Sequence, residues 1–242
     1  MGNTYFKFKQ FTVHQQGSAM KVCTDACIQG AFTALHAGNA ARVLDIGAGT
    51  GLLSLMLAQG MVDADPARPA PVHIDAIELD AAAATQAREN FDASPWKDRL
   101  HLIRDDIRHY HPATQYPFII TNPPFFENDL KSPDHQRNAA MHAVSLDYEA
   151  LLDAIRRLLT PDGRFSVLLP YEGFQRFRKL AADFVLQELL EIRQTPAHGY
   201  FRAVGIFGKS GTLHREELTI YDDQRQYTPA FIQLLKPYYL YL

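Results

Sequence analysis

The strongest constraint on the fold is an alternation, from about residue 41 onwards, of short apolar runs with segments of helical spacing. An apolar run at 41–46 is followed by helical spacing at 52–59, and a second run at 72–79 by an alanine-rich helix at 81–91. Strands that alternate with helices in this way are typical of repeated β-α units. The sequence therefore predicts an α/β fold with a mostly parallel sheet.

The later elements continue this alternation. Apolar runs predict strands at 100–104, 116–121 and 164–169, and helical spacing predicts helices at 147–159, 172–184 and 229–235. Residues 189–195 and 203–209 are typical of an antiparallel pair, and 218–221 of an additional edge strand. A surface loop is expected at 60–71, a polar loop at 127–145 and a turn at 161–163.

Composition excludes several classes of protein. With 242 residues, 47% of them hydrophobic, the chain can bury one core. A formal charge of −3 predicts no overall field that would attract a polyanion. No apolar run is long enough to span a membrane, and the first residues lack the apolar centre of a signal peptide. Cys23 and Cys27 have no second ligand pair, so we expect no metal site and a reducing, cytoplasmic location.

A glycine-rich turn, DIGAGTG at 45–51, connects the first predicted strand to its helix. Glycines let the backbone approach a ligand closely, and the free N–H groups of the next helix point toward that ligand. Glu78 ends the second strand, where its carboxylate can accept hydrogen bonds from both hydroxyls of a ribose. Asp80 stands at the N-cap position of the next helix. The pattern predicts a nucleoside-type cofactor, and an NAD-binding protein is the alternative.

The sequence Asn122-Pro123-Pro124-Phe125 follows the strand at 116–121 and indicates what the cofactor is used for. An exocyclic amino nitrogen is a poor nucleophile because its lone pair is delocalised into the ring. Hydrogen bonds to the Asn122 side-chain oxygen and the Pro123 carbonyl would free that lone pair. The two prolines restrict the backbone, and Phe125 offers a face on which a base can stack, worth about 1–3 kcal/mol.

Together the two motifs resemble S-adenosylmethionine-dependent methyltransferases that modify a planar amide or amino nitrogen. The resemblance implies that Asp45 interacts with the amino group of the methionine portion of the cofactor. It also implies that one acid of the pair Asp105 and Asp106 accepts the adenine amino group, with Asp106 favoured because the apolar Ile107 follows it. The other implied cofactor-binding residues are Gly47, Gly49, Gly51, Glu78, Leu79 and Asn122.

A more specific resemblance covers nearly the whole chain. The segments FTVHQQGSAMKVCTDA at 11–26, NDLKSPDHQRNAAMHAVSLDYEALL at 128–152 and YTPAFIQLLKPYYLYL at 227–242 are similar to bacterial tRNA(Val) adenine-N6 methyltransferases. The resemblance places Lys21, Thr24 and Asp25 beside the cofactor, and Pro124, Phe125, Lys131 and Arg137 on the substrate side. Cys23 stands where that family usually has glycine.

The resemblance implies a Rossmann-like methyltransferase fold, with a mostly parallel seven-stranded sheet, one antiparallel strand and helices on both faces. Residues 1–40 would form an extension on the cofactor and substrate side, and 41–242 the methyltransferase domain. The implied reaction moves a methyl group from S-adenosylmethionine to N6 of adenine in tRNA, at position 37 of tRNA(Val) in the anticodon loop. No obligate protein partner is expected.

Three alternatives remain open: an adenine-N6 DNA methyltransferase, a protein-glutamine N5-methyltransferase and an RNA-binding protein on an inactive methyltransferase scaffold. The sequence offers no target-recognition region and no helical domain in front, which argues against the first two. Lys7 and Lys9 could contact RNA phosphates. Tyr238, Tyr239 and Tyr241 either stack on bases or anchor the C-terminal segment to the domain.

Overall fold

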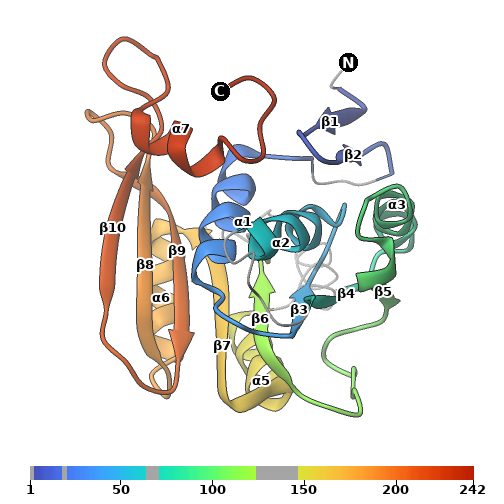
Figure 1. Cartoon of the computed structure of the whole chain (residues 1–242). Helices are drawn as coiled ribbons and strands as arrows, with labels where there is room; N and C mark the ends of the chain where they lie inside the picture. Colours follow the sequence, from blue (N-terminus) through green and yellow to red (C-terminus); the bar gives the residue numbers. More distant parts are fainter. Residues whose placement is uncertain (1–2, 18–20, 64–70, 124–146) are drawn as a thin grey trace, which may run out of the picture.

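A computed structural model of the chain describes residues 3–17, 21–63, 71–123 and 147–242. Its centre is an eight-stranded sheet with the order β10-β8-β9-β7-β6-β3-β4-β5 (Figure 1). Strand β9 pairs antiparallel with both β7 and β8, and the other neighbouring pairs of this sheet are parallel. The expected Rossmann-like methyltransferase architecture is confirmed.

The strands are β1 (Tyr5–Lys7), β2 (Thr12–His14), β3 (Arg42–Ile46), β4 (His73–Glu78), β5 (Leu100–Arg104), β6 (Tyr116–Thr121), β7 (Leu159–Pro170), β8 (Val185–Arg193), β9 (Tyr200–Gly208) and β10 (His214–Thr219). The helices are α1 (Thr24–His36), α2 (Leu52–Asp63), α3 (Ala81–Asp92), the 3₁₀ turn η1 (Lys97–Arg99), α5 (Tyr148–Leu158), α6 (Tyr171–Leu180) and α7 (Pro229–Leu235). Among the described residues, no helix is both long and apolar enough to cross a membrane.

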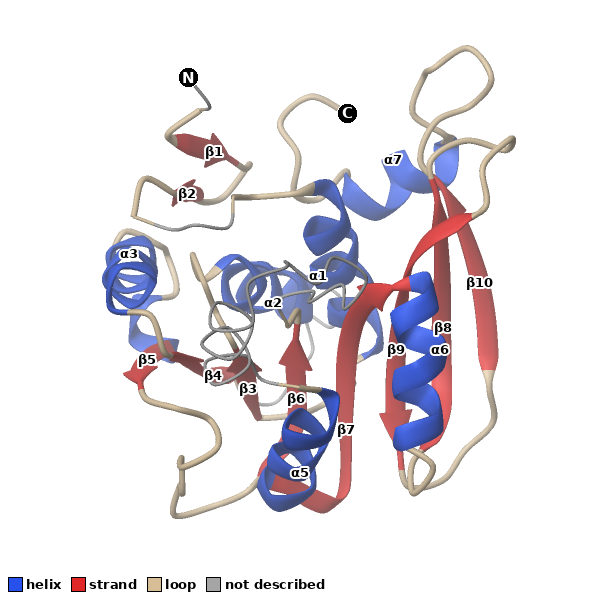
Figure 2. Ribbon diagram, turned by 180° about the vertical axis from the view of Figure 1, so that it is seen from behind, coloured by secondary structure: helices blue, strands red, loops and turns tan. Residues whose placement is uncertain are grey.

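Helices cover the sheet on two faces, with α1, α2 and α3 in front in Figure 1 and α5 and α6 in front when the molecule is seen from behind (Figure 2). Each face has its own apolar cluster, because successive side chains of a strand point to opposite sides. In β3, Val43 belongs to the cluster with α1 and α2, whereas Leu44 and Ile46 belong to the cluster with α5 and α6.

The N-terminal segment joins the first of these clusters. Phe8, Phe11 and Val13 are buried in the same core as α1 and α2. Asn90 of α3 binds β2 through its side chain, donating to the His14 carbonyl at 2.8 Å and accepting from the His14 N–H at 2.9 Å. The described part of residues 1–40 therefore shares a hydrophobic core with the rest of the chain.

Several details differ from the sequence-based prediction. The sheet has eight strands because β10, the possible edge strand, pairs parallel with β8. The predicted turn at 161–163 lies within β7, where the register shifts: Tyr116 pairs with Leu159 but Phe118 with Arg164. Residues 60–63 continue α2, so that part of the predicted loop is wrong, and residues 64–70 lie outside the described structure.

Gly60 lies within α2 at a position where no side chain fits. A Cβ at this position would lie 2.6 Å from the Cβ of Ala34 and would overlap the Tyr238 hydroxyl. We expect Gly60→Ala to lower the free energy of unfolding by about 1–3 kcal/mol, measured by urea denaturation. Gly199→Ala is the control, because a Cβ there meets nothing within 4 Å. Equal stability of the two variants would contradict this packing.

Candidate active site

A cavity of about 670 Å³ opens where β3, β4, β5 and β6 end. Its lining includes the glycine turn after β3, Glu78 at the end of β4 and Leu79 after it, the residues that follow β5, and Asn122 after β6. The carboxyl ends of parallel strands meet at one edge of a sheet, which is why motifs far apart in the sequence share this site. The volume is in the range of about 300–1,000 Å³ that is usual for small-molecule sites.

The glycine turn forms one wall of the cavity. Gly47 and Gly49 have φ of 73° and 55°, in the left-handed region. A Cβ on either would meet nothing within 4 Å, so the backbone presents open space to a ligand. Gly51 has a φ of 80°, but its Cβ would meet the ring of Phe91, so this glycine serves packing rather than the cavity wall.

Glu78 is held in place by two backbone donors. Its Oε2 accepts from the Gly49 N–H and its Oε1 from the Asp80 N–H, both at 2.8 Å. Each carboxylate oxygen can accept a further hydrogen bond, which is what binding of two ribose hydroxyls requires. The Asp80 side chain accepts from the Ala83 N–H at 2.8 Å, so the prediction that it caps α3 is confirmed.

Asp45 lies behind the glycine turn and is fully buried. Its Oδ2 accepts from the backbone N–H of Ser54 at 3.1 Å and from the Ser54 hydroxyl at 2.7 Å. Its Oδ1 is buried and has no hydrogen-bond partner among the described residues. Burial, opposed by the Ser54 hydrogen bonds, raises the pKa of Asp45 to about 7. A cationic group placed beside Oδ1 would favour the ionised form.

This pKa predicts a pH-dependent stability in the absence of ligand. The folded pKa of Asp45 lies above the ordinary value of 3.8, so the buried carboxyl keeps its proton at pH values where the unfolded chain has lost it. The stabilising contribution of the protonated carboxyl is fully present below pH 3.8 and is lost as pH rises through about 7. We therefore expect the stability of the native protein, relative to Asp45→Asn, to fall between these pH values. Urea unfolding of both proteins across this range measures it. A constant difference would contradict the raised pKa.

Asn122 and Pro123 follow β6 at the edge of the cavity. The Asn122 Oδ1 is buried and accepts no hydrogen bond from the described residues. The residue before it is fixed on two sides: the Thr121 hydroxyl donates to the Ile46 carbonyl at 3.0 Å, and the Gln29 amide donates to the Thr121 carbonyl at 2.8 Å. Helix α1 and strand β3 thus position an unused amide oxygen beside the cavity.

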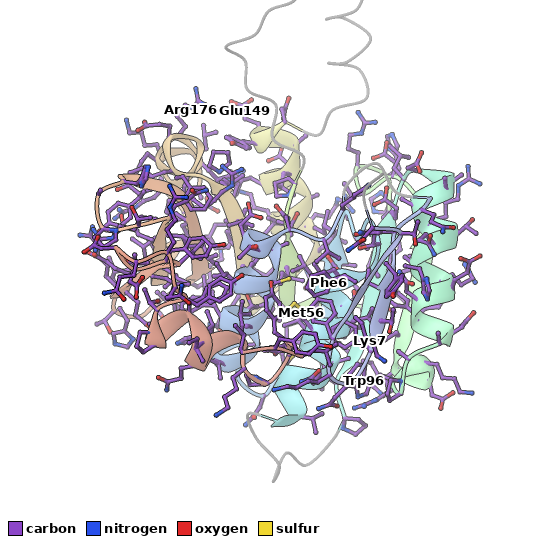
Figure 3. All side chains as sticks on the ribbon, turned by 90° about the horizontal axis from the view of Figure 1, so that it is seen from above. Phe6, Lys7, Met56, Trp96, Glu149 and Arg176 are labelled. Atoms are coloured by element: carbon purple, nitrogen blue, oxygen red, sulfur yellow. The ribbon has the colours of Figure 1, made fainter. Side chains whose placement is uncertain are left out.

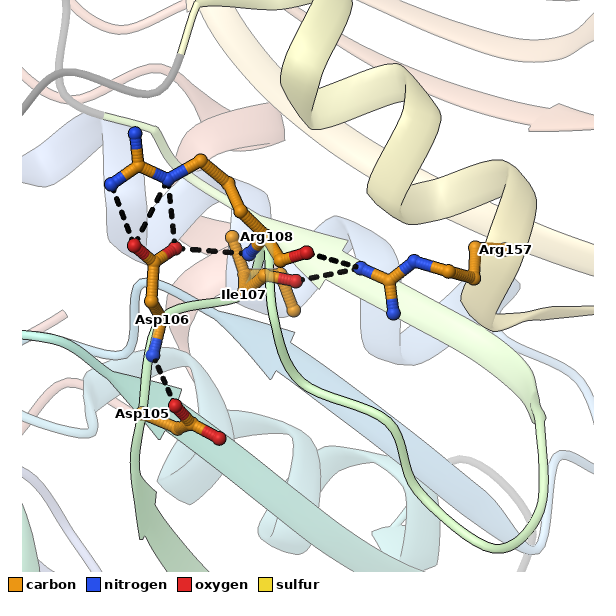
Figure 4. A network of polar contacts seen from close by, with 5 residues as sticks. All are labelled: Asp105, Asp106, Ile107, Arg108 and Arg157. Atoms are coloured by element: carbon orange, nitrogen blue, oxygen red, sulfur yellow. Dashed lines mark hydrogen bonds and ion pairs between the residues drawn. The ribbon is translucent and has the colours of Figure 1, made fainter. Parts of the chain in front are cut away.

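The two acids after β5 both line the cavity, and among the described residues only Asp106 pairs with an arginine (Figure 4). Arg108 donates to Asp106 from Nε at 2.9 Å and from Nη2 at 2.6 Å, and this contact lowers the pKa of Asp106. Asp105 accepts from the Asp106 N–H at 2.7 Å through Oδ1. Asp106 is therefore a firmly ionised acceptor at neutral pH.

Arg157 of α5 holds the backbone of this acidic loop (Figure 4). Its Nη2 donates to the Ile107 carbonyl at 2.8 Å and to the Arg108 carbonyl at 3.3 Å, and its Nη1 donates to the Tyr110 carbonyl. These three contacts tie the loop that carries Asp106 to the helix that packs behind the sheet. Arg157 does not line the cavity, so it acts on a ligand only through this loop.

We expect Arg157→Ala to weaken cofactor binding about tenfold, because the lost hydrogen bonds release the loop. The rate of transfer at saturating cofactor should stay near that of the native protein, since Arg157 is away from the reacting atoms. Arg156→Ala is the matched control: its side chain pairs with Asp153 and Asp183 at 3.0 and 2.8 Å, outside the loop. Equal cofactor affinities of the two variants would remove this role from Arg157.

The N-terminal candidates are divided by the structure. Lys21 lines the cavity, as do Cys23 and Ala26. Asp25 is turned toward β9, where it forms an ion pair with Arg202 at 2.9 Å. Thr24 is the first residue of α1. Neither Thr24 nor Asp25 is among the cavity-lining residues.

The predicted site residues that line the cavity are Lys21, Gly47, Gly49, Glu78, Leu79, Asp106, Ile107 and Asn122. Pro124, Phe125, Lys131 and Arg137 lie outside the described residues. Two residues that the sequence did not single out are Gln29 and Arg108. Gln29 is a polar residue within an apolar stretch, which was the one available signal. The described residues contain no cluster of metal-ligating side chains, and Cys23 and Cys27 are free.

Comparison with known proteins identifies a matching family and close relatives of this chain. A family model described as methyltransferase small domain matches residues 24–171. A tRNA1(Val) (adenine(37)-N6)-methyltransferase of Dyadobacter fermentans is 44% identical over 245 residues, which cover 98% of this chain and 98% of the relative. A protein of the same name from Bacteroides thetaiotaomicron is 38% identical over 247 residues and covers 100% of both chains.

Similarity to solved structures concerns the fold alone. The crystal structure of an Agrobacterium tumefaciens protein described as a predicted O-methyltransferase superposes with a TM-score of 0.64 at 17% identity. The match covers 88% of this chain and 96% of that one. The two chains therefore share their fold over most of their length.

Proposed function

The chain belongs to the family of the tRNA1(Val) (adenine(37)-N6)-methyltransferases, and from this membership we propose that it transfers a methyl group from S-adenosylmethionine to N6 of adenine 37 in tRNA1(Val). The observation that carries the proposal is the Asn122 Oδ1: a buried amide oxygen without a partner among the described residues, at the edge of the cavity. A buried acceptor of this kind costs free energy unless a ligand donates to it. An exocyclic amino group is such a donor.

The residues around the cavity fit S-adenosylmethionine, which supplies a methyl group on a sulfonium cation. Gly47 and Gly49 leave room for a ligand against the backbone, and Glu78 offers two oriented oxygens to the ribose. Asp45 is not among the cavity-lining residues, but its buried Oδ1 has no partner in the described part of the chain and would accept a hydrogen bond from the methionine amino group. We propose Asp106, with its carboxylate held ionised by Arg108, as the acceptor of the adenine amino group; Asp105 is the alternative.

Apolar and N-terminal residues complete the proposed cofactor site. Leu79 and Ile107 line the cavity on either side of the acids and would contact the adenine ring. Lys21 would reach the cofactor from the N-terminal segment. Thr24 would shape the site as the first residue of α1, and Asp25 through its ion pair with Arg202. Gly51 would act through the conformation of the turn.

For the reaction itself, Asn122 and the Pro123 carbonyl would accept the two N–H groups of the target nitrogen. This interaction favours a pyramidal nitrogen whose lone pair can attack the methyl carbon in line with the departing sulfur. The nitrogen gains the methyl group, the carbon–sulfur bond breaks, and one of the two N–H protons is then released to water. Positioning and electrostatics would dominate such a displacement, and no strong general base is needed. Pro124 and Phe125 would stack on the adenine, and Lys131 and Arg137 would contact the RNA.

The proposal also includes the domain organisation of the chain and its location in the cell. We propose residues 1–40 as an extension on the cofactor and substrate side, supported by Lys21, Cys23 and Ala26 in the cavity lining, and 41–242 as the methyltransferase domain. The tRNA would be bound at its anticodon loop, without an obligate protein partner. A tRNA substrate also favours a cytoplasmic location.

Transfer of labelled methyl groups tests this function. The protein is incubated with labelled S-adenosylmethionine and tRNA1(Val) transcribed in vitro, beside the same tRNA with adenine 37 replaced by guanine. Label recovered as N6-methyladenine in the first tRNA alone is expected. Label in DNA or in a protein glutamine would support the other methyltransferase classes, and RNA binding without cofactor binding would support an inactive scaffold.

A further inference from the structure

Negative charge is unevenly distributed along the chain. Residues 1–24 and 224–242 contain none of the 27 Asp and Glu residues of the protein, although its net charge is −3. They contain five of the 24 Lys and Arg residues: Lys7, Lys9, Lys21, Arg225 and Lys236. The two basic segments lie at opposite ends of the sequence, which is why no basic stripe is visible in it.

The structure joins these two segments. Phe8 forms an antiparallel bridge with Tyr239, and the Lys9 N–H donates to the Tyr238 carbonyl at 2.8 Å. The Lys9 ammonium donates to the Lys236 carbonyl, a contact across 227 residues of sequence. Both segments lie at the end of the molecule toward which β6 points (Figure 1).

The joined segments form a cleft of about 400 Å³ between β1 and the C-terminal segment. Its described lining residues include Lys7 and three tyrosines, Tyr5, Tyr239 and Tyr241, and no acidic residue. Tyr239 packs against Phe8, with ring centroids 5.9 Å apart, and Tyr238 is buried, so these two anchor the C-terminal segment as expected.

Two of the lining tyrosines are exposed. Tyr5 is 52% exposed and Tyr241 is 91% exposed. Tyr241 therefore does not anchor the C-terminal segment. Lys7, Lys9 and Lys236 are also exposed around the cleft. In the view from above, Phe6 and Lys7 lie on the same side as Trp96, across the molecule from Glu149 and Arg176 (Figure 3).

We propose that this terminal surface, formed by Tyr5, Lys7, Lys9, Lys236 and Tyr241, binds unpaired nucleotides of the RNA substrate outside the active site. Lysines neutralise phosphates, and exposed aromatic rings accept bases of any sequence by stacking. The combination of flat rings with positive charge and no acid fits a single-stranded nucleic acid. The inference rests on the proposed function, because that function makes the substrate an RNA.

The surface also adjoins the proposed active site along the chain. The segment that begins with β1 and β2 continues to Lys21, Cys23 and Ala26, which line the large cavity. An RNA that presents a base at Asn122 could therefore extend along the N-terminal segment toward Lys7. This arrangement would add affinity away from the reacting base without contacting the cofactor.

Lys7 and Tyr241 are exposed, so substitutions there test RNA binding without disturbing the packed core. Lys7→Glu and Tyr241→Ala are compared with the native protein for affinity to tRNA1(Val), measured by filter binding at several salt concentrations. Loss of a stacking side chain is expected to weaken binding about five- to hundredfold. For Lys7→Glu we expect weaker binding and a salt slope that is smaller by about one, as for a lost phosphate contact.

Lys179→Glu is the matched control, because this exposed lysine lies on α6, on the opposite face of the sheet. Cofactor affinity and kcat at saturating tRNA should be unchanged in all three variants, with KM for tRNA raised in the two surface variants alone. Wild-type tRNA affinity in Lys7→Glu and Tyr241→Ala would overturn the proposal. The proposal would also be overturned if the two surface variants lost affinity for anionic lipid vesicles but not for tRNA.

The two proposals fail in different ways. Full methylation of tRNA1(Val) by both surface variants at native KM would overturn the terminal surface and leave the enzyme activity standing. RNA binding that depends on Lys7 and Tyr241, in a protein that methylates no RNA, would overturn the activity and support the surface.

Discussion

Asn122→Ala is expected to lower methyl transfer at least about 100-fold, the usual effect of removing one positioned polar group from a reaction centre. The structure gives the reason: Oδ1 is buried at the cavity edge and unsatisfied by the described residues, so the target nitrogen is its proposed partner. Removing an unsatisfied acceptor costs little stability, and the melting temperature of the variant should equal or exceed that of the native protein. Single-turnover transfer measures the first effect and thermal unfolding the second.

Cofactor affinity is the control for this variant, because Glu78, and not Asn122, is proposed to bind the ribose. We expect S-adenosylmethionine to bind Asn122→Ala within a few-fold of the native affinity. Asn122→Asp keeps an oxygen acceptor at the same position and should retain more activity than the alanine variant. Loss of cofactor binding in proportion to activity would show that Asn122 supports the cofactor rather than the target base.

Glu78→Ala is expected to weaken cofactor binding at least about 100-fold, because two charge-assisted hydrogen bonds to the ribose are lost together. The variant also removes the acceptor of the Gly49 N–H and so releases the glycine turn. Isothermal titration of the ligand-free protein with S-adenosylmethionine measures the change. Transfer at saturating cofactor should recover most of the native rate, since Glu78 does not contact the target base.

Asp80→Ala provides a stringent control, since Asp80 also lines the cavity two residues away. Its carboxylate caps α3, so its loss should lower the free energy of unfolding by about 1 kcal/mol. Cofactor affinity should stay within a few-fold of the native value. If the two acids proved equally important for affinity, the division between a ribose ligand and a helix cap would be wrong.

Much of the sheet could be predicted because its central strands are continuous apolar runs. The strands at 100–104 and 116–121 and the helix at 229–235 have the predicted bounds. Helix α1 was missed because its residues 26–34 are all buried. Its polar residues Gln29 and Thr33 form hydrogen bonds inside the protein, so they do not mark a solvent-facing side of the helix. Strand β10 follows β9 after residues 209–213 but pairs with β8, on the side of β8 away from β9. A short sequence pattern does not encode which strand an edge strand pairs with, or its direction.

For the site, the sequence identified residues by their position at strand ends. Position at a strand end was informative for Glu78 and Asn122, which both line the cavity, because the carboxyl ends of parallel strands meet at one edge of a sheet. It was less informative for Asp25, whose partner Arg202 lies 177 residues away. The contacts of Arg108 and Arg157 with the acidic loop also depend on tertiary packing, and nothing in the local sequence distinguishes these arginines from others on the surface.

The bridge between Phe8 and Tyr239 has a consequence for synthesis of the protein. The two partners leave the ribosome at very different times, so β1 and β2 emerge long before the strand-like segment that covers them. During that interval Phe8 and Phe11 lack part of their packing, and exposed apolar surface of this kind promotes aggregation. Folding of the N-terminal segment is therefore completed only after nearly all of the chain has been translated.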